Sequence, residues 1–184
     1  MRDDLTDADG PPDDALVARW LGGDERAATR LVERHAPALA RYASSLGARD
    51  DVDALVQDTF VRAFGSLDGF RGSSTLRTWL FTILRRLVVD RRRADRRRRE
   101  DQAVPESLAA SEYGALDGIV AAETTQRVGA AVERLTKTQR EVFQLRVSEG
   151  MSYKEIADVA GTTEGAARVH YHNALRALKE ALDV

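Results

Sequence analysis

The chain has 184 residues, 43% of them hydrophobic, which is enough for one large domain or two small ones with buried cores. Charged residues make up 32% of it, with a formal net charge of −2, and the absence of cysteine excludes disulfides and thiolate metal sites. No apolar run approaches the ~20 residues that cross a bilayer, and the N-terminus does not resemble a signal peptide, so we expect a cytoplasmic protein.

The charges are segregated along the chain. Residues 1–14 hold six aspartates and one arginine, whereas residues 71–99 hold eleven arginines and two aspartates. One strongly basic segment in a nearly neutral chain is typical of contact with a phosphate backbone. Residues 1–12 are polar and end in Gly-Pro-Pro, so we expect a disordered acidic tail there.

Helical periodicity dominates and strand signals are nearly absent, which predicts an all-α fold. Four helices are expected in the first half, at about residues 13–21, 24–46, 52–67 and from 76 into the arginine-rich segment, with a loop over 68–74 before the last. Asp24 is expected to cap the second helix, and Pro37 to kink it. The apolar stripes of the third and fourth helices comprise Val52, Leu55, Val56, Thr59, Phe60, Ala63, Phe64 and Leu67, then Leu76, Trp79, Leu80, Ile83, Leu84 and Leu87.

The periodicity fails over residues 100–118, where a proline, small residues and acids without a base indicate a linker. Helices resume near Ile119, and one of them carries Val128, Val132 and Leu135 on one side. The next helix is expected to begin at a Thr138 cap, with Glu141 completing a capping box.

The C-terminal segment reads as a helix-turn-helix. Ser152 and Glu155 have capping-box spacing, Gly161 permits the left-handed conformation that ends a helix, and Thr163 is placed to cap the next one. The second helix carries its apolar residues on one side: Ala167, Tyr171, Ala174, Leu175 and Leu178. Two short helices joined by such a turn form the unit that places a helix in the DNA major groove.

Three strings together resemble a bacterial sigma factor of the extracytoplasmic-function (ECF) group. They are DALVQDTFVRAF at 53–64, FRGSSTLRTWLFTILRRLVVDRRR at 70–93 and LTKTQREVFQLRVSEGMSYKEIADVAGTTEGAARVHYHNAL at 135–175. The resemblance implies two small helical domains joined by a flexible acidic linker: region two over 13–99 and region four over 119–184. Such a protein binds the β′ clamp helices and the β flap of core RNA polymerase, recognises a promoter and helps to melt it.

The resemblance also implies contact residues, no cofactor, and an anti-sigma factor as a further partner. Core polymerase would be bound by Asp53, Gln57, Asp58 and Arg62. Minus-ten DNA would be contacted by Arg62, Phe70, Arg71, Arg77, Arg85 and Arg86, and the minus-thirty-five element by Thr163, Glu164, Arg168, Val169 and His172. The chain departs from the family at Arg86, Val169, His170 and Asn173, so the resemblance does not specify the preferred promoter bases.

The residues alone leave other readings open. The polar face of helix 53–64 has the pattern of an ordinary solvated face, and Phe70 could fold back onto the core instead of facing DNA. Residues 91–99 fit either a phosphate-contacting extension or a solvated helix end. His170 and His172 point about 200° apart on a helix, which does not favour a metal pair.

The alternative function is a stand-alone LuxR-type helix-turn-helix regulator, which would carry an unrelated sensory N-terminal half. A helical adaptor without a DNA function is a third candidate, against which the arginine cluster argues. No nucleophilic triad, metal-ligand cluster or glycine-rich phosphate loop occurs at usable spacing, so we expect no enzyme activity.

Overall fold

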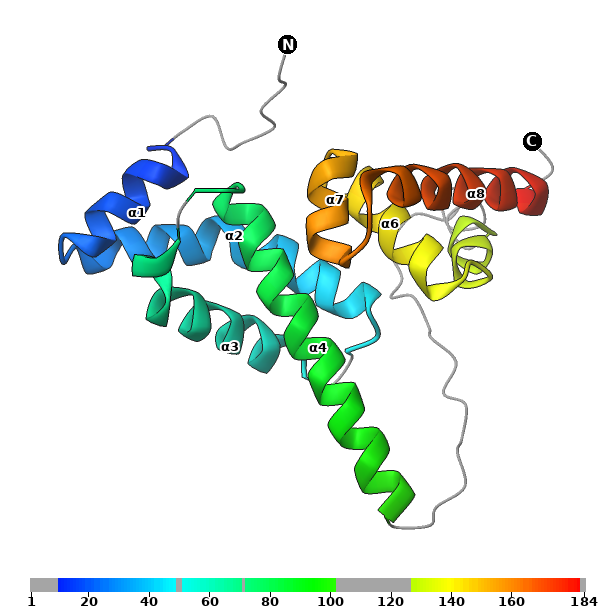
Figure 1. Ribbon diagram of the computed structural model, residues 1–184, viewed down its shortest axis with the longest axis horizontal. Coiled ribbons are helices and arrows are strands. Elements are labelled where there is room, and N and C mark those ends of the chain that lie inside the picture. The colour runs from blue at the N-terminus through cyan, green and yellow to red at the C-terminus, as the bar shows by residue number, and fades with distance from the viewer. Residues whose placement is uncertain (1–9, 49–50, 71, 102–126, 183–184) are drawn as a thin grey trace, which may run out of the picture. The chain divides into compact units, whose positions relative to one another are not determined.

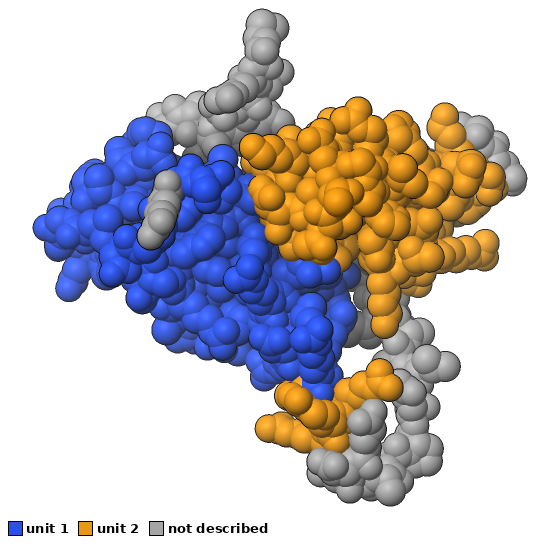
Figure 2. All heavy atoms as spheres, in the orientation of Figure 1, with its two compact units in different colours: residues 1–93 blue, residues 94–184 orange. Residues whose placement is uncertain are grey.

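A computed structural model of the chain describes residues 10–48, 51–70, 72–101 and 127–182, without the side chains of residues 99–101. Every regular element in these ranges is a helix, which confirms the all-α prediction. Figure 1 shows the helices along the chain. The chain divides into two compact units, unit 1 over residues 1–93 and unit 2 over residues 94–184 (Figure 2). The predicted tail and linker lie largely outside the described residues, so the domain borders that they imply stay predictions.

The helices of the first half begin and end close to the predicted positions. They are α1 (Asp13–Leu21), α2 (Glu25–Ser45), α3 (Val52–Gly65), the 3₁₀ turn η1 (Leu67–Gly69) and α4 (Leu76–Asp101), which continues past the end of unit 1. Asp24 caps α2 as expected, because its side chain accepts a hydrogen bond from the Arg26 amide at 3.0 Å. Helix α2 continues through Pro37. None of the helices in the described part of the chain is long and apolar enough to span a bilayer.

Helix α2 forms the centre of unit 1, with α1, α3 and α4 packed around it. Its Tyr42 ring stacks on Phe81 of α4 at a centroid distance of 5.1 Å, and both residues are 0% exposed. Helix α1 contributes Leu16, also 0% exposed, and its Trp20 meets Phe64 of α3 at 5.1 Å. The packing therefore joins helices that are far apart in sequence.

The predicted apolar stripes of α3 and α4 are confirmed. The buried members are Leu55, Val56, Thr59, Phe60, Ala63, Leu67, Leu76, Leu80, Leu84 and Leu87, and the half-buried members are Val52, Phe64, Trp79 and Ile83. The stripe on α4 is wider than the sequence pattern predicted, because Phe81 and Val88 are buried as well. Phe81 directly follows Leu80 of the stripe in sequence and lies on the side of α4 that faces α2.

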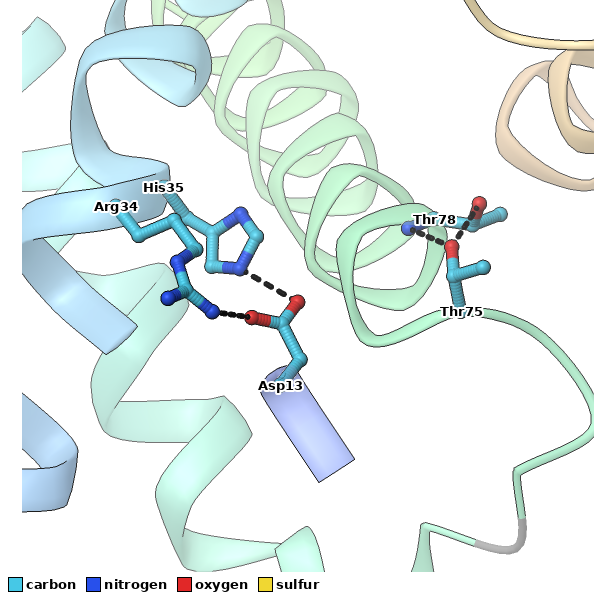
Figure 3. A network of polar contacts seen from close by, with 5 residues as sticks. All are labelled: Asp13, Arg34, His35, Thr75 and Thr78. Carbon is cyan, nitrogen blue, oxygen red and sulfur yellow. Dashed lines mark hydrogen bonds and ion pairs between the residues drawn. The ribbon is translucent and has the colours of Figure 1, made fainter. Parts of the chain in front are cut away.

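A charged contact joins α1 to α2 at the start of α1 (Figure 3). The Asp13 carboxylate accepts hydrogen bonds from Arg34 at 2.7 Å and pairs with His35 Nε2 at 2.8 Å. His35 is 4% exposed, and sequence reasoning did not foresee its pairing with a carboxylate. Burial raises the pKa of Asp13, but hydrogen bonds and charge from His35 and Arg34 outweigh it, so the net pKa is lowered.

Figure 3 also shows how α4 begins. The Thr75 hydroxyl accepts a hydrogen bond from the Thr78 amide at 3.1 Å, and the two threonine hydroxyls lie 2.8 Å apart. This side-chain cap satisfies an amide at the N-terminus of α4, where the helix itself supplies no acceptor.

Beyond the end of α4, the described residues of unit 2 contain a helical segment at 127–133 and three labelled helices. These are α6 (Lys137–Val147), α7 (Tyr153–Ala160) and α8 (Glu164–Leu182). Their shared core includes Val142, Leu145, Met151, Ile156, Ala167 and Ala174, each at most 2% exposed. Ala131, Val132 and Leu135 pack against Ala174 and Leu178, whereas Val128, predicted for the same side as Val132, is 37% exposed.

The predicted cap of α6 is wrong by two residues. The capping box is formed by Thr136 and Gln139, not by Thr138 and Glu141. The two boxes overlap in the sequence, so spacing alone does not choose between them. With Thr136 as the cap, α6 begins at Lys137, and Arg140 Nε donates to the Val132 carbonyl of the preceding helical segment at 3.1 Å.

The helix-turn-helix is confirmed at each predicted boundary. The Ser152 hydroxyl and the Glu155 carboxylate bond each other's backbone amides at 3.3 and 2.9 Å. Gly161 ends α7 in the left-handed conformation, with φ 65° and ψ 44°, and the Thr163 hydroxyl accepts from the Ala166 amide at 3.1 Å. Ala167, Ala174 and Leu178 of α8 are buried, and Tyr171 and Leu175 are half-buried.

Candidate nucleic-acid interface

A largely apolar groove of about 570 Å³ runs between α2 and α3 in unit 1. It is lined by Val32, Ala36, Pro37 and Ala40 of α2 and by Asp53, Val56, Gln57, Phe60, Val61 and Phe64 of α3. Two of the four residues predicted for polymerase binding, Asp53 and Gln57, form its polar rim. Asp58 and Arg62 are exposed on α3 but do not line it.

Sequence reasoning missed one exposed apolar residue of this groove, Val61. Val61 is 65% exposed, although it lies within a helix of good apolar periodicity. The sequence did contain a signal for it. Val61 lies outside the buried stripe of α3, and an exposed valine beside a buried face extends the apolar surface that a partner could contact. The α2 wall of the groove could not be foreseen, since it depends on how α2 and α3 pack.

The aromatic of the predicted melting loop is folded back. Phe70 is half-buried and its ring contacts Trp79 of α4 at a centroid distance of 5.0 Å, with an interplanar angle of 36°. Arg71, its neighbour in the predicted set, lies outside the described residues. Of the two hypotheses for Phe70, the structure therefore supports the one in which the ring folds back onto the protein.

The predicted arginines of α4 fall on different sides of that helix. Arg86 is exposed and lies seven positions after Trp79, so it shares the side of α4 on which Phe70 stacks. Arg93, also exposed, follows seven positions later on the same side. Arg77 lies on another side, with its guanidinium 5.4 Å from the Phe81 ring centroid.

Arg85 is half-buried, about 100° around α4 from Arg86. The exposed arginines continue beyond it, and Arg91 forms an ion pair with Asp51 at 3.0 Å. The predicted minus-ten set is therefore divided. Phe70 and Arg86 lie on the same side of α4, Arg77 and Arg85 lie elsewhere on that helix, and Arg62 is exposed on α3.

The predicted minus-thirty-five residues lie at the start of α8. The Arg168 guanidinium bonds the Glu164 carboxylate at 3.1 Å, and both side chains are more than half exposed, at 56% and 54%. Val169 is 57% exposed and His172 is exposed, whereas the hydroxyl of Thr163 serves as the cap of the helix. Sequence reasoning did not foresee that Arg168 also lies over the ring of Tyr153, 4.9 Å from its centroid.

Comparison with known proteins gives two family matches, one mostly within unit 1 and one within unit 2. Residues 31–98 match the model for sigma-70 region 2, and residues 125–178 match the model for sigma-70, region 4. The RNA polymerase sigma factor CnrH of Cupriavidus metallidurans is 35% identical, over 94% of this chain and 96% of that protein. The ECF RNA polymerase sigma-E factor of Escherichia coli K12 is 32% identical, over 93% and 92%. The chain is an ECF sigma factor.

Two solved structures agree with this assignment. The sigma factor RpoE of Bartonella quintana, in complex with the anti-sigma factor NepR, has a TM-score of 0.67 and 31% identity, over 85% of this chain and 96% of that one. CnrH in complex with the cytosolic domain of CnrY has a TM-score of 0.67 and 32% identity, over 93% and 97%.

The ECF sigma factor therefore carries both regions that its sequence resembled. The region-two match begins within α2 and extends along α4, so it includes the groove, the Phe70–Trp79 contact and Arg86. The region-four match includes α6, α7 and the first part of α8. A sigma factor directs transcription initiation by RNA polymerase at its promoters, and the stand-alone LuxR-type alternative is not favoured because the N-terminal half is a sigma region.

Proposed function

We propose that this sigma factor binds core RNA polymerase through the α2–α3 groove. The observation that carries the proposal is the combination of an apolar floor, the exposed Val61 and a polar rim of Asp53 and Gln57. A groove between two helices accepts a third helix through apolar anchors, and the β′ clamp of the polymerase is helical. Asp58 and Arg62, exposed on the same helix, would form the polar edge of this interface.

For the minus-ten element, we propose the side of α4 defined by Trp79, Arg86 and Arg93, together with Phe70. Aromatic rings next to cations suit an unstacked base and the phosphates attached to it. Phe70 would swing off Trp79, or the Phe70–Trp79 pair would form one wall of the base site. Arg62, Arg71, Arg77 and Arg85 would contact the strand more peripherally.

For the minus-thirty-five element, we propose the exposed side of α8. Arg168 has the planar fork that pairs bidentately with guanine, and Val169 and His172 extend the same surface toward base edges. Thr163 and the amides at the start of α8 would take a phosphate, since a helix N-terminus favours an anion. Other surfaces of unit 2 would contact the β flap.

An anti-sigma factor is the third proposed partner. One solved relative is in complex with the anti-sigma factor NepR, and another is in complex with the cytosolic domain of CnrY. The exposed apolar residues of the α2–α3 groove would be covered by such a protein when polymerase is absent. We place this regulation in the cytoplasm, and we expect the sigma factor to act by binding alone, without catalysis or a cofactor.

Two exposed valines offer a direct test, because each lies in a different proposed interface. Val61→Glu should weaken binding to core polymerase roughly tenfold or more, since docking would bury an unpaired carboxylate. Val169→Glu should leave core binding unchanged and reduce only promoter-dependent transcription. Core binding is measured by fluorescence anisotropy, and transcription by run-off assays on a pool of promoter fragments.

Equal affinity of Val61→Glu and the unmodified protein for core polymerase would contradict the groove assignment. A more general failure is also recognisable. If the protein never associates with core polymerase but binds duplex DNA by itself, the stand-alone regulator takes the place of the proposed function.

A further inference from the structure

Tyr153, the first residue of α7, lies at the junction of three helices in unit 2. Its half-buried ring is contacted by Arg146 of α6 at 5.0 Å and by Arg168 of α8 at 4.9 Å, measured from each guanidinium carbon to the ring centroid. Tyr171 of α8 meets it edge-on at 5.9 Å and 62°. One aromatic ring thus connects the end of α6 to the exposed side of α8.

The ring has little freedom to move. Its backbone is fixed by the Ser152–Glu155 capping box, which begins α7 immediately before it. Arg146 is itself held, because its Nη1 donates to the Met151 carbonyl at 2.7 Å. Tyr171, which also contacts the Tyr153 ring, stacks on Phe143 of α6 with a centroid distance of 6.4 Å and an interplanar angle of 19°.

Arg168 in contrast is a long side chain that is 56% exposed. Glu164, one turn earlier, attracts its guanidinium from one direction, and the Tyr153 ring provides a flat surface for it. Guanidinium groups favour the faces of aromatic rings, and a side chain ordered before binding loses less entropy when a base is bound. The two contacts together restrict where the planar fork of Arg168 can point.

We propose that Tyr153 is a positioning residue for base recognition: its ring holds the Arg168 guanidinium ready for a guanine of the minus-thirty-five element. This inference rests on the proposed role of α8 in reading that element. Tyr153 determines specificity through Arg168, so its contribution is confined to the single base position that Arg168 reads.

The contacts of the ring distinguish this role from packing alone. The apolar link between α6 and α8 already exists in the Phe143–Tyr171 stack and in the buried Ala174 and Leu178. A leucine at position 153 would preserve apolar volume but offer no aromatic face to Arg168. A phenylalanine would preserve the face and lose only the hydroxyl.

The test is selection of promoter fragments randomised across the minus-thirty-five element by holoenzyme, reconstituted from core polymerase and the full chain. Sequencing the bound fragments gives the base preference at each position. Arg168→Ala identifies the position that Arg168 reads. At that position Tyr153→Leu should reduce the preference roughly two- to fivefold, the range of an exposed cation–π contact. Tyr153→Phe should keep most of it, and Tyr153→Leu should add nothing in the Arg168→Ala background.

Phe143→Leu is the packing control, because it removes a ring of α6 that stacks on Tyr171 rather than on Tyr153. It should lower the melting temperature of the protein without singling out the Arg168 position. The inference is overturned if Tyr153→Leu keeps the preference at that position, or if it weakens all positions equally. It is also overturned if Tyr153→Phe fails as completely as Tyr153→Leu. Failure of the proposed function is distinct, because the unmodified holoenzyme would then select no sequence at all.

Discussion

Unit 1 and unit 2 are both small and all-helical, but their helices are held in different ways. In unit 1 large side chains from distant helices meet, as Tyr42 of α2 and Phe81 of α4 do at 5.1 Å. In unit 2 both α6 and α7 begin at a complete capping box, and alanines make up four of the seven buried residues of α7 and α8. Stability in unit 1 should therefore depend on long-range packing, and in unit 2 more on the chemistry of helix ends.

The largest expected effect comes from removing a packing residue of unit 1. Phe81→Ala deletes a fully buried ring and should lower the free energy of unfolding by about 3–5 kcal/mol. Chemical denaturation followed by circular dichroism measures the loss, and hydrogen exchange localises it to residues of unit 1. Val61→Ala, at a 65% exposed position, should change stability by less than about 0.5 kcal/mol. A small loss of stability in Phe81→Ala would contradict the claim that unit 1 depends on long-range packing.

The next effect is expected from the polar contact that joins α1 to α2. Asp13→Ala should cost about 1–3 kcal/mol at neutral pH, because Arg34 and His35 lose a common acceptor in a mostly buried site. Asp14→Ala, in the same helical turn but exposed, is the matched control and should change little. Urea denaturation of the two variants at pH 7 gives the difference, and equal losses would contradict the role of the contact.

The same carboxylate predicts a pH dependence. The folded-state pKa of Asp13 is lowered from 3.8, so its stabilisation is complete above that value and is lost as the pH falls through the lowered pKa. The difference in unfolding free energy between the unmodified protein and Asp13→Ala should therefore shrink as the pH is taken below about 4. A difference that stays constant down to pH 2 would show that the ionised carboxylate is not responsible.

In unit 2, two glycines of the helix-turn-helix should respond with opposite signs. Gly161→Ala places a side chain on a residue with φ 65° and should cost about 1–2 kcal/mol. Gly165→Ala lies inside α8, where an added Cβ meets nothing within 4 Å, and should stabilise by roughly 0.5–1 kcal/mol. Melting temperatures of both variants test this, and equal shifts would show that the turn does not depend on the left-handed residue.

The smallest effect is expected at a helix cap. Ser152→Ala removes the hydroxyl that accepts from the Glu155 amide and should cost about 1 kcal/mol. Ser148→Ala, at the exposed C-terminal end of α6, is the control and should be nearly neutral. Hydrogen exchange at the first amides of α7 sharpens the comparison, because a purely local cap changes protection there first. If protection falls equally across both units, the cap is not local.

Much of this architecture could be predicted from the sequence, because helix boundaries are encoded in a few neighbouring residues. The Ser152–Glu155 box, Gly161 and Thr163 each act over three or four positions, and each was placed correctly. The error at α6 arose where two such boxes overlap. There the observed box occurs together with a hydrogen bond from Arg140 to the Val132 carbonyl, a contact that spacing does not specify.

The site was less predictable, since its geometry depends on contacts between helices. Two readings of Phe70 fitted the sequence, and only its contact with Trp79 distinguishes them. The arginines of α4 were grouped by their position in the chain, but the helix distributes Arg77 and Arg86 over different sides. The Tyr153 ring over which Arg168 lies is fifteen positions away in sequence, beyond the reach of any helical periodicity.

The buried and the exposed residues of helix α8 are expected to be under different selective constraints. Its buried side carries Ala167, Ala174 and Leu178, where larger side chains would force α8 away from α6 and α7. Its exposed residues include Glu164, Arg168 and Val169, whose substitution leaves the core untouched. Duplicated copies of such a gene could therefore diverge in the promoters that they use while inheriting the same fold. The helix is equally suited to engineering, because promoter preference could be exchanged by grafting a few exposed side chains.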